Sequence, residues 1–120
     1  MTDKALDGRK ILVVEDEYFQ AREMKALLER QGATVVGPVS RASEAEALLI
    51  EQPVDAAVLD INLGGGPNFA TANLLQREGV PFAIVTGYDK SAIPAELSAV
   101  PRLDKPASEK ALIAQLAQLV

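Results

Sequence analysis

Five residues with chemically useful side chains each follow a short apolar run in the sequence. They are the acidic residues Glu15, Asp16 and Asp60, the hydroxyl residue Thr86 and the cation Lys105. Carboxylates bind hard cations such as Mg²⁺ and can attack phosphorus, while hydroxyl and ammonium groups donate to phosphoryl oxygens. If these residues meet in the fold, the chemistry that they predict is phosphoryl transfer.

The apolar runs indicate how the five residues meet. Residues 11–14, 56–59 and 82–85 are continuously apolar, without the alternation that a strand with one wet face shows. We therefore expect parallel strands that are buried on both faces. The carboxyl ends of such strands share one edge of the sheet, where open α/β sheets bind ligands. The polar residues that follow the runs should gather at that edge.

The rest of the chain alternates between strand and helix patterns. The expected strands are residues 10–15, 33–39, 53–60, 82–86 and 100–104, and the expected helices are residues 17–30, 40–51, 69–78 and 108–120. We expect Ser40 and Ser108 to cap their helices. Residues 89–99 contain Pro94 and predict a short or irregular helix. This order predicts a flavodoxin-like α/β domain, a five-stranded parallel sheet of order 2-1-3-4-5 with helices on both faces.

Two details of this pattern can be checked against a structure. The second strand is interrupted by Gly37 and Pro38, which predicts a position at the edge of the sheet. In the first helix, the helical period predicts an inward face that is formed by the following residues: Tyr18, Ala21, Met24 and Leu28.

Composition narrows the possible functions. The 120 residues suit one domain, residues 1–120, with a polar N-terminal extension at 1–8. The net charge of −5 argues against direct binding to nucleic acid. The absence of Cys and His leaves the chemistry to carboxylates, hydroxyls and Lys. Because the sequence shows neither a signal peptide nor a long apolar segment, we expect no membrane insertion and a cytoplasmic location.

The individual residues also have simpler interpretations. The acidic residues 15–17 are also typical of a solvated helix start. Asp60 and Asn62 are of types that are common in turns, and Lys105 is of a type that is common on exposed surfaces. Position favours function, since Asp60 ends the most apolar strand and can attack phosphorus to form an acyl phosphate. The backbone carbonyl of Asn62 would then complete the shell of a bound metal. Residues 64–66 are three glycines, but no Gly-Lys-Ser/Thr follows, so a nucleotide-binding loop is rejected.

Four motifs together resemble the receiver domain of bacterial two-component response regulators, which has the CheY-like form of this fold. They are ILVVEDE at 11–17, VLDINL at 58–63, VTGY at 85–88 and KP at 105–106. The resemblance implies Asp60 as phosphoacceptor, with Glu15, Asp16 and Asp60 as ligands of Mg²⁺ (or Mn²⁺). It also implies Thr86 as the switch hydroxyl and Lys105 as the partner of the phosphate.

The sequence PFAIVTGY at 81–88 further resembles the alphaproteobacterial receivers nicknamed FAT GUY, which are often stand-alone domains. The chain departs from many receivers at Arg102, where a rotating aromatic residue is common, and at Ala107, where Phe is frequent. Tyr88 is a second candidate switch residue, which would gate access to the phosphoryl group, although a surface tyrosine fits equally well.

The leading hypothesis is a single-domain response regulator, not an enzyme with a separate substrate. A sensor histidine kinase or histidine phosphotransfer protein would phosphorylate Asp60, and a downstream protein target would read the altered surface. One alternative is a pseudo-receiver that recruits a partner without phosphorylation. The other is an aspartate-nucleophile phosphatase, which usually needs a second Asp where this chain has Asn62.

Overall fold

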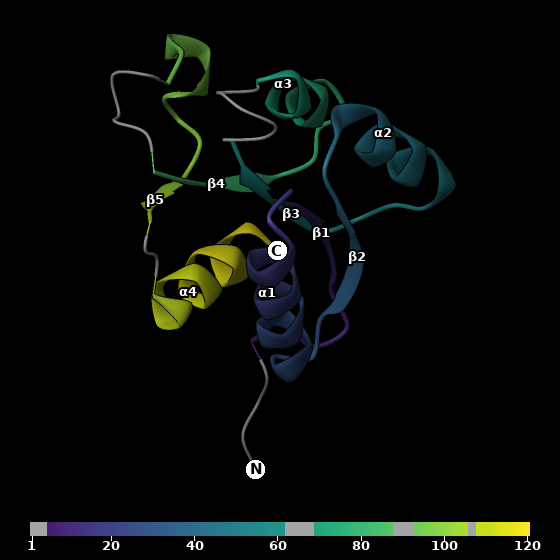
Figure 1. Cartoon of the computed structure of the whole chain (residues 1–120), viewed down its shortest axis with the longest axis vertical. Coiled ribbons are helices and arrows are strands. Elements are labelled where there is room, and N and C mark those ends of the chain that lie inside the picture. Colours follow the sequence, from purple (N-terminus) through teal and green to yellow (C-terminus); the bar gives the residue numbers. More distant parts are fainter. Residues whose placement is uncertain (1–4, 62–68, 88–92, 106–107) are drawn as a thin grey trace.

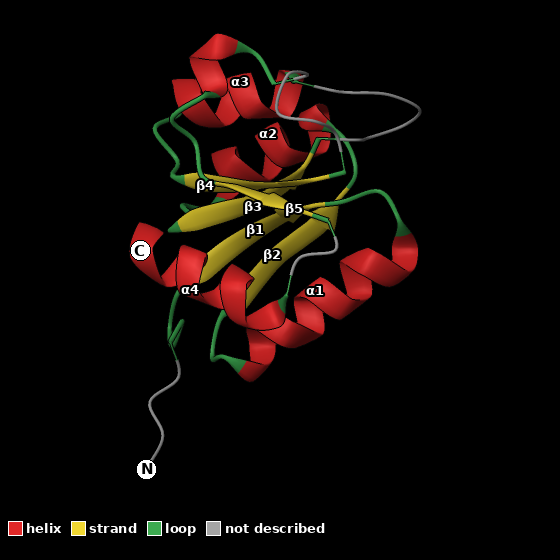
Figure 2. Cartoon of the chain, turned by 90° about the vertical axis from the view of Figure 1, so that its left-hand side faces the viewer, coloured by secondary structure: helices red, strands yellow, loops and turns green. Residues whose placement is uncertain are grey.

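The computed structural model of the chain describes residues 5–61, 69–87, 93–105 and 108–120. A central sheet lies between two layers of helices (Figures 1 and 2). Its strands are β1 (Lys10–Val14), β2 (Thr34–Val39), β3 (Ala56–Asp60), β4 (Phe82–Thr86) and β5 (Arg102–Asp104). All neighbouring strands are parallel and the order is β2-β1-β3-β4-β5. The predicted topology is confirmed, and so is the edge position of the second strand.

Helices cover both faces of this sheet. Helices α1 (Tyr18–Arg30) and α4 (Glu109–Leu119) lie on one face, and α2 (Ala42–Glu51) and α3 (Ala70–Arg77) lie on the other (Figure 2). Between β4 and β5, the described residues form a short 3₁₀ helix, η2 (Ala95–Leu97). In the described part of this connection, the expectation of a short or irregular helix is therefore confirmed.

The helix starts follow local capping chemistry. The carboxylate of Glu17 caps α1 by accepting from the backbone N–H groups of Phe19 and Gln20. Ser108 caps α4, as predicted, by accepting from the N–H of Ala111 at 3.0 Å. The prediction of Ser40 as the cap of α2 is wrong. Its hydroxyl and backbone N–H both donate to the Glu44 carboxylate instead, and Arg41 occupies the capping position.

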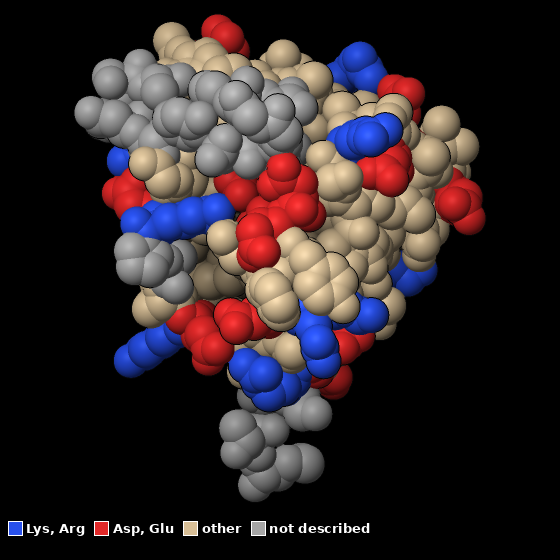
Figure 3. Space-filling model, in the orientation of Figure 1, with Lys and Arg blue, Asp and Glu red and all other residues tan. Residues whose placement is uncertain are grey.

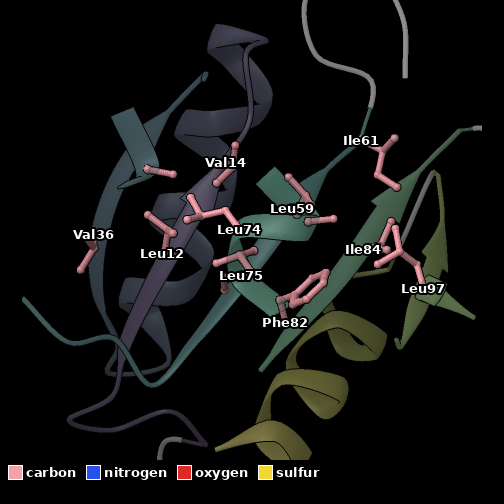
Figure 4. Packing of buried hydrophobic residues seen from close by; sticks show 13 residues of the cluster. Leu12, Val14, Val36, Leu59, Ile61, Leu74, Leu75, Phe82, Ile84 and Leu97 are labelled. Atoms are coloured by element: carbon pink, nitrogen blue, oxygen red, sulfur yellow. The ribbon is translucent and has the colours of Figure 1, made fainter. Parts of the chain in front are cut away.

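The sheet separates two hydrophobic clusters, because successive side chains of a strand point to opposite faces. Leu12 and Leu59 belong to the cluster under α2 and α3, part of which is drawn in Figure 4. Ile11 and Val58 belong to the cluster under α1 and α4. Strands β1, β3 and β4 are therefore buried on both faces, as their continuous apolar runs predict.

Tyr18 and Leu6 show how the N-terminal part of the chain packs. Tyr18 is 69% exposed, so its placement on the inward face of the first helix is wrong; Ala21, Leu27 and Leu28 are the buried residues of α1. Leu6 is fully buried in the cluster under α1 and α4, and its N–H donates to the carbonyl oxygen of Gln31. The described part of the polar N-terminal segment thus packs on the domain. Among the described residues, no helix is long and apolar enough to cross a membrane.

Candidate functional site

The strand ends place the predicted residues at one edge of the sheet. Glu15 and Asp16 follow β1, Asp60 ends β3 and Thr86 ends β4. The register aligns these ends, since Asp60 is paired with Val85, one residue before Thr86. Lys105 follows β5, and its backbone N–H donates to the carbonyl oxygen of Thr86 at 2.8 Å. Ordinary parallel pairing therefore brings together residues that are far apart in the sequence.

Three carboxylates form a cluster at this edge. One oxygen each from Glu15, Asp16 and Asp60 lie within 4.8 Å of one another. Glu15 and Asp60 are 8% and 5% exposed, whereas Asp16 is open to solvent. An all-oxygen set of this size matches the ligand preference of Mg²⁺ rather than that of softer metals. The donor chemistry of the cluster is thus compatible with the expected cofactor.

The side chain of Lys105 spans this cluster. Its Nζ lies 2.8 Å from Oδ2 of Asp60 and 3.7 Å from Oε1 of Glu15. The same ammonium donates to Oε1 of Gln20, in the first turn of α1, at 2.9 Å. The sequence predicted the pairing of Lys105 with Asp60, but Gln20 was missed. A glutamine one helical turn after Asp16 carries no pattern that marks it, because its contact depends on the path of the lysine side chain.

The crowded acids change the electrostatics of Glu15. Its pKa is raised from 4.5 to about 7, mainly by burial and also by a hydrogen bond with Asp60 and by repulsion from the charge of Asp60. The N–H of Glu17, which donates to the Glu15 carboxylate at 3.1 Å, and the charge of Lys105 act in the opposite direction. The folded protein therefore holds the proton of Glu15 more tightly than an exposed glutamate would.

Thr86 is fully buried at the end of β4, next to the strand that carries Asp60. The other two candidates, the backbone carbonyl of Asn62 and the side chain of Tyr88, lie outside the described residues. The structure therefore assembles Glu15, Asp16, Asp60 and Lys105 directly, with Thr86 on the adjacent strand.

A cavity of about 480 Å³ opens beside the cluster, between α1 and α4. Its floor is apolar and includes Met24, Leu27 and Leu112, while Asp60 and Lys105 form part of its polar rim. On the face of the molecule shown in Figure 3, acidic and basic side chains are interspersed. The acidic cluster thus lies beside an apolar cavity, and Asp16 is its solvent-exposed member.

A doubly wound sheet of this order, with a buried aspartate, a clustered acidic pair and a lysine at its strand ends, defines the class of receiver-type signalling domains. The family model of the response regulator receiver domain matches residues 11–117. The chain therefore belongs to the receiver domains of response regulators.

Comparison with individual proteins supports this membership. The sensory transduction protein LytT of Bacillus cereus is 35% identical over 111 residues, which cover 89% of this chain and 45% of the relative. The phyllosphere-induced regulator PhyR of Methylorubrum extorquens is 32% identical over 115 residues, 88% of this chain and 42% of the relative. The chain thus spans less than half the length of these two curated relatives.

Among solved structures, the solution structure of SdrG from Sphingomonas melonis Fr1 has a TM-score of 0.77 and 34% identity. The match covers 96% of this chain and 97% of that chain. A putative response regulator from Chloroflexus aurantiacus has a TM-score of 0.80 at 22% identity, with 92% and 96% covered, and supports the fold alone.

Proposed function

We propose that this receiver domain accepts a phosphoryl group on Asp60 and signals through altered contacts with other proteins. The observation that carries the proposal is the buried Asp60 carboxylate, 2.8 Å from the ammonium of Lys105 and beside two further carboxylates. Buried acids without such partners would be costly to keep ionised, so the arrangement fits a nucleophile better than a turn residue.

The donor would be a phosphohistidine of a sensor histidine kinase or of a histidine phosphotransfer protein. A carboxylate oxygen of Asp60 attacks phosphorus and forms an O–P bond, while the N–P bond to the donor imidazole breaks and its electron pair returns to that nitrogen. Lys105 offsets the charge of the phosphoryl oxygens, and the hydroxyl of Thr86 donates to one of them. Both residues lie at the edge of the sheet that also carries Asp60, because Thr86 ends β4 and Lys105 follows β5.

Glu15, Asp16 and Asp60 would hold Mg²⁺ (or Mn²⁺), with the backbone carbonyl of Asn62 as a further ligand. The bound cation supplies charge neutralisation while the phosphoryl group approaches three clustered acids. The chain contributes the geometry: two of the acids are buried and their oxygens lie within 4.8 Å of the third. Magnesium binding also requires Glu15 to lose its proton, because only the carboxylate is a ligand.

The output would be a shift between two arrangements of the residues around Thr86 and Lys105, with Tyr88 as a further candidate switch residue. The backbone hydrogen bond from Lys105 to Thr86 couples the two strand ends that would move. A relative of similar length supports this view: the structure of SdrG in a BeF₃-activated conformation is 32% identical, and the match covers all of both chains. In this proposal the chain would act as an adaptor, a phosphate sink or a relay.

The test is the intact mass of the protein after incubation with acetyl phosphate, with and without Mg²⁺. We expect a phosphate adduct on the wild type that requires the cation and is absent from Asp60→Asn. Asp104→Asn is the matched control, because Asp104 is an exposed aspartate at the end of β5 and should be labelled normally.

Three results would contradict the proposal. Labelling that persists in Asp60→Asn would remove Asp60 as the acceptor. A wild type that binds Mg²⁺ but stays unlabelled, both with acetyl phosphate and with phosphorylated histidine kinases, would instead favour the pseudo-receiver. Multiple turnover of small phosphate esters would favour the phosphatase.

A further inference from the structure

We infer that Gln20 is a positioning residue, which holds the ammonium of Lys105 over Asp60 for phosphoryl transfer; this inference rests on the function proposed above. Nothing in the sequence pattern or in the family match assigns a role to this residue. The inference comes from the contact between its side-chain carbonyl oxygen and Nζ of Lys105, at 2.9 Å.

The ammonium of Lys105 has three donors and meets acceptors from three parts of the chain. The distances are 2.8 Å to Asp60 on β3, 2.9 Å to Gln20 on α1 and 3.7 Å to Glu15 after β1. Two of these are short enough to be full hydrogen bonds. Gln20 therefore provides one of the two strong contacts that fix the position of the charge.

Gln20 differs from the two acids in a way that matters for the reaction. Asp60 becomes an acyl phosphate when it accepts the phosphoryl group, and the charge of Glu15 changes with loss of its proton and is offset when a cation binds. The Gln20 amide stays neutral throughout, so its contact with Lys105 can persist through these steps. A neutral acceptor also leaves the full positive charge of the lysine available to the phosphoryl oxygens.

The surroundings of Lys105 make this contact with Gln20 necessary. Lysine has a flexible stem, and holding it in one conformation costs side-chain entropy. Gln20 and Lys105 both line the rim of the cavity between α1 and α4, so the stem is not enclosed by packed side chains on this side. The Gln20 contact bridges α1 and the residue after β5 across this opening.

The backbone of Gln20 is itself held by a hydrogen bond. The backbone N–H of Gln20 donates to the Glu17 carboxylate at 2.7 Å, within the cap of α1. The first turn of the helix is therefore fixed at its start, and the glutamine side chain projects from a defined position. A positioning residue needs a well-fixed backbone, because a mobile Gln20 would leave the position of the Lys105 ammonium poorly defined.

The test measures the rate of phosphate incorporation with acetyl phosphate and Mg²⁺. Gln20→Met keeps the length of the side chain but removes the acceptor, and we expect a rate about tenfold lower. Gln20→Glu retains an oxygen acceptor but pairs a negative charge with Lys105, so it should recover only part of the rate. Gln118→Met, on the exposed face of α4, is the matched control and should react as the wild type does.

A double-mutant cycle separates positioning from general damage to the fold. In the Lys105→Met background, Gln20→Met should cause no further loss, because there is no ammonium left to hold. A tenfold loss that persists in that background would overturn the inference, and so would equal rates for Gln20→Met and the wild type. If neither acetyl phosphate nor a phosphorylated histidine kinase labels the wild type, the proposed function fails and this inference fails with it. A labelled wild type whose rate is unchanged by Gln20→Met overturns this inference alone.

Discussion

The raised pKa of Glu15 predicts an unusual dependence of stability on pH in the absence of divalent cations. Folding raises the pKa of this carboxyl group from 4.5 to about 7, so the folded protein binds the proton more tightly than the unfolded chain does. The stabilisation is complete below the lower value and is lost as the pH rises through the higher one. Metal-free protein should therefore become less stable between mildly acidic and mildly basic pH.

The size of the effect follows from the two pKa values. Between about pH 5 and about pH 8, the free energy of unfolding should fall by roughly 2–3 kcal/mol. With an ordinary urea dependence for a domain of this size, that corresponds to a decrease of roughly 1–2 M in the urea midpoint. The chain has no His to add its own titration in this range. The lowered pKa of Glu44, caused mainly by hydrogen bonds from Ser40, acts at more acidic pH.

The assay is urea unfolding in the presence of EDTA, followed by circular dichroism across this pH range. Glu15→Gln cannot titrate, so its midpoint should stay nearly constant and should exceed that of the wild type at the basic end. Millimolar Mg²⁺ should raise the wild-type midpoint more at the basic end than at the acidic end, because proton and cation compete for the same carboxylate. A metal-free midpoint that is flat or rises with pH would refute the reasoning.

Three further predictions concern other described residues. Leu6→Ala should lower the free energy of unfolding by about 2–4 kcal/mol in urea experiments, because Leu6 is fully buried; a loss below about 1 kcal/mol would show that the N-terminal segment is not part of the core. In the same assay, Ser108→Ala should lower the free energy of unfolding by about 1 kcal/mol, whereas Ser108→Thr should keep the cap and most of the stability. Equal losses for the two variants would contradict the capping role. Lys105→Met should raise the pKa of Glu15 further, because the lysine charge lowers it, and a carboxyl ¹³C NMR titration that gave a lower value would contradict the electrostatic account.

Most of the fold could be predicted because local signals and burial agree. Strand β4 has the predicted bounds, residues 82–86, since an apolar run there is enclosed by Pro81 and Gly87. Helix caps were predicted less well, because neighbouring side chains compete for the same hydrogen bonds. Ser40 donates to the Glu44 carboxylate and does not cap its helix. Among the described residues, no such acceptor binds Ser108, and its hydroxyl caps α4. Tyr18 was misplaced because the helical period cannot show where the sheet stops covering the helix.

The site was predictable to the extent that backbone topology alone assembles it. Asp60 ends a strand, and Glu15 and Lys105 directly follow strands. Because the ends of these parallel strands must align, the three residues are neighbours whatever the conformations of their side chains. The role of Gln20 depends on where a flexible lysine side chain finds its acceptors, and no periodicity in the sequence encodes that. The high pKa of Glu15 likewise results from burial and a shared hydrogen bond, which appear when the chain is folded.

The division of the interior into two clusters has a consequence for how this domain can change over evolutionary time. Each cluster belongs to one layer of helices, and the strands are the elements that the two layers share. Substitutions that remodel the surface of α2 and α3 repack one cluster and leave the other undisturbed. New recognition specificities can therefore accumulate on opposite sides of the sheet independently, while the acidic edge between them keeps its chemistry.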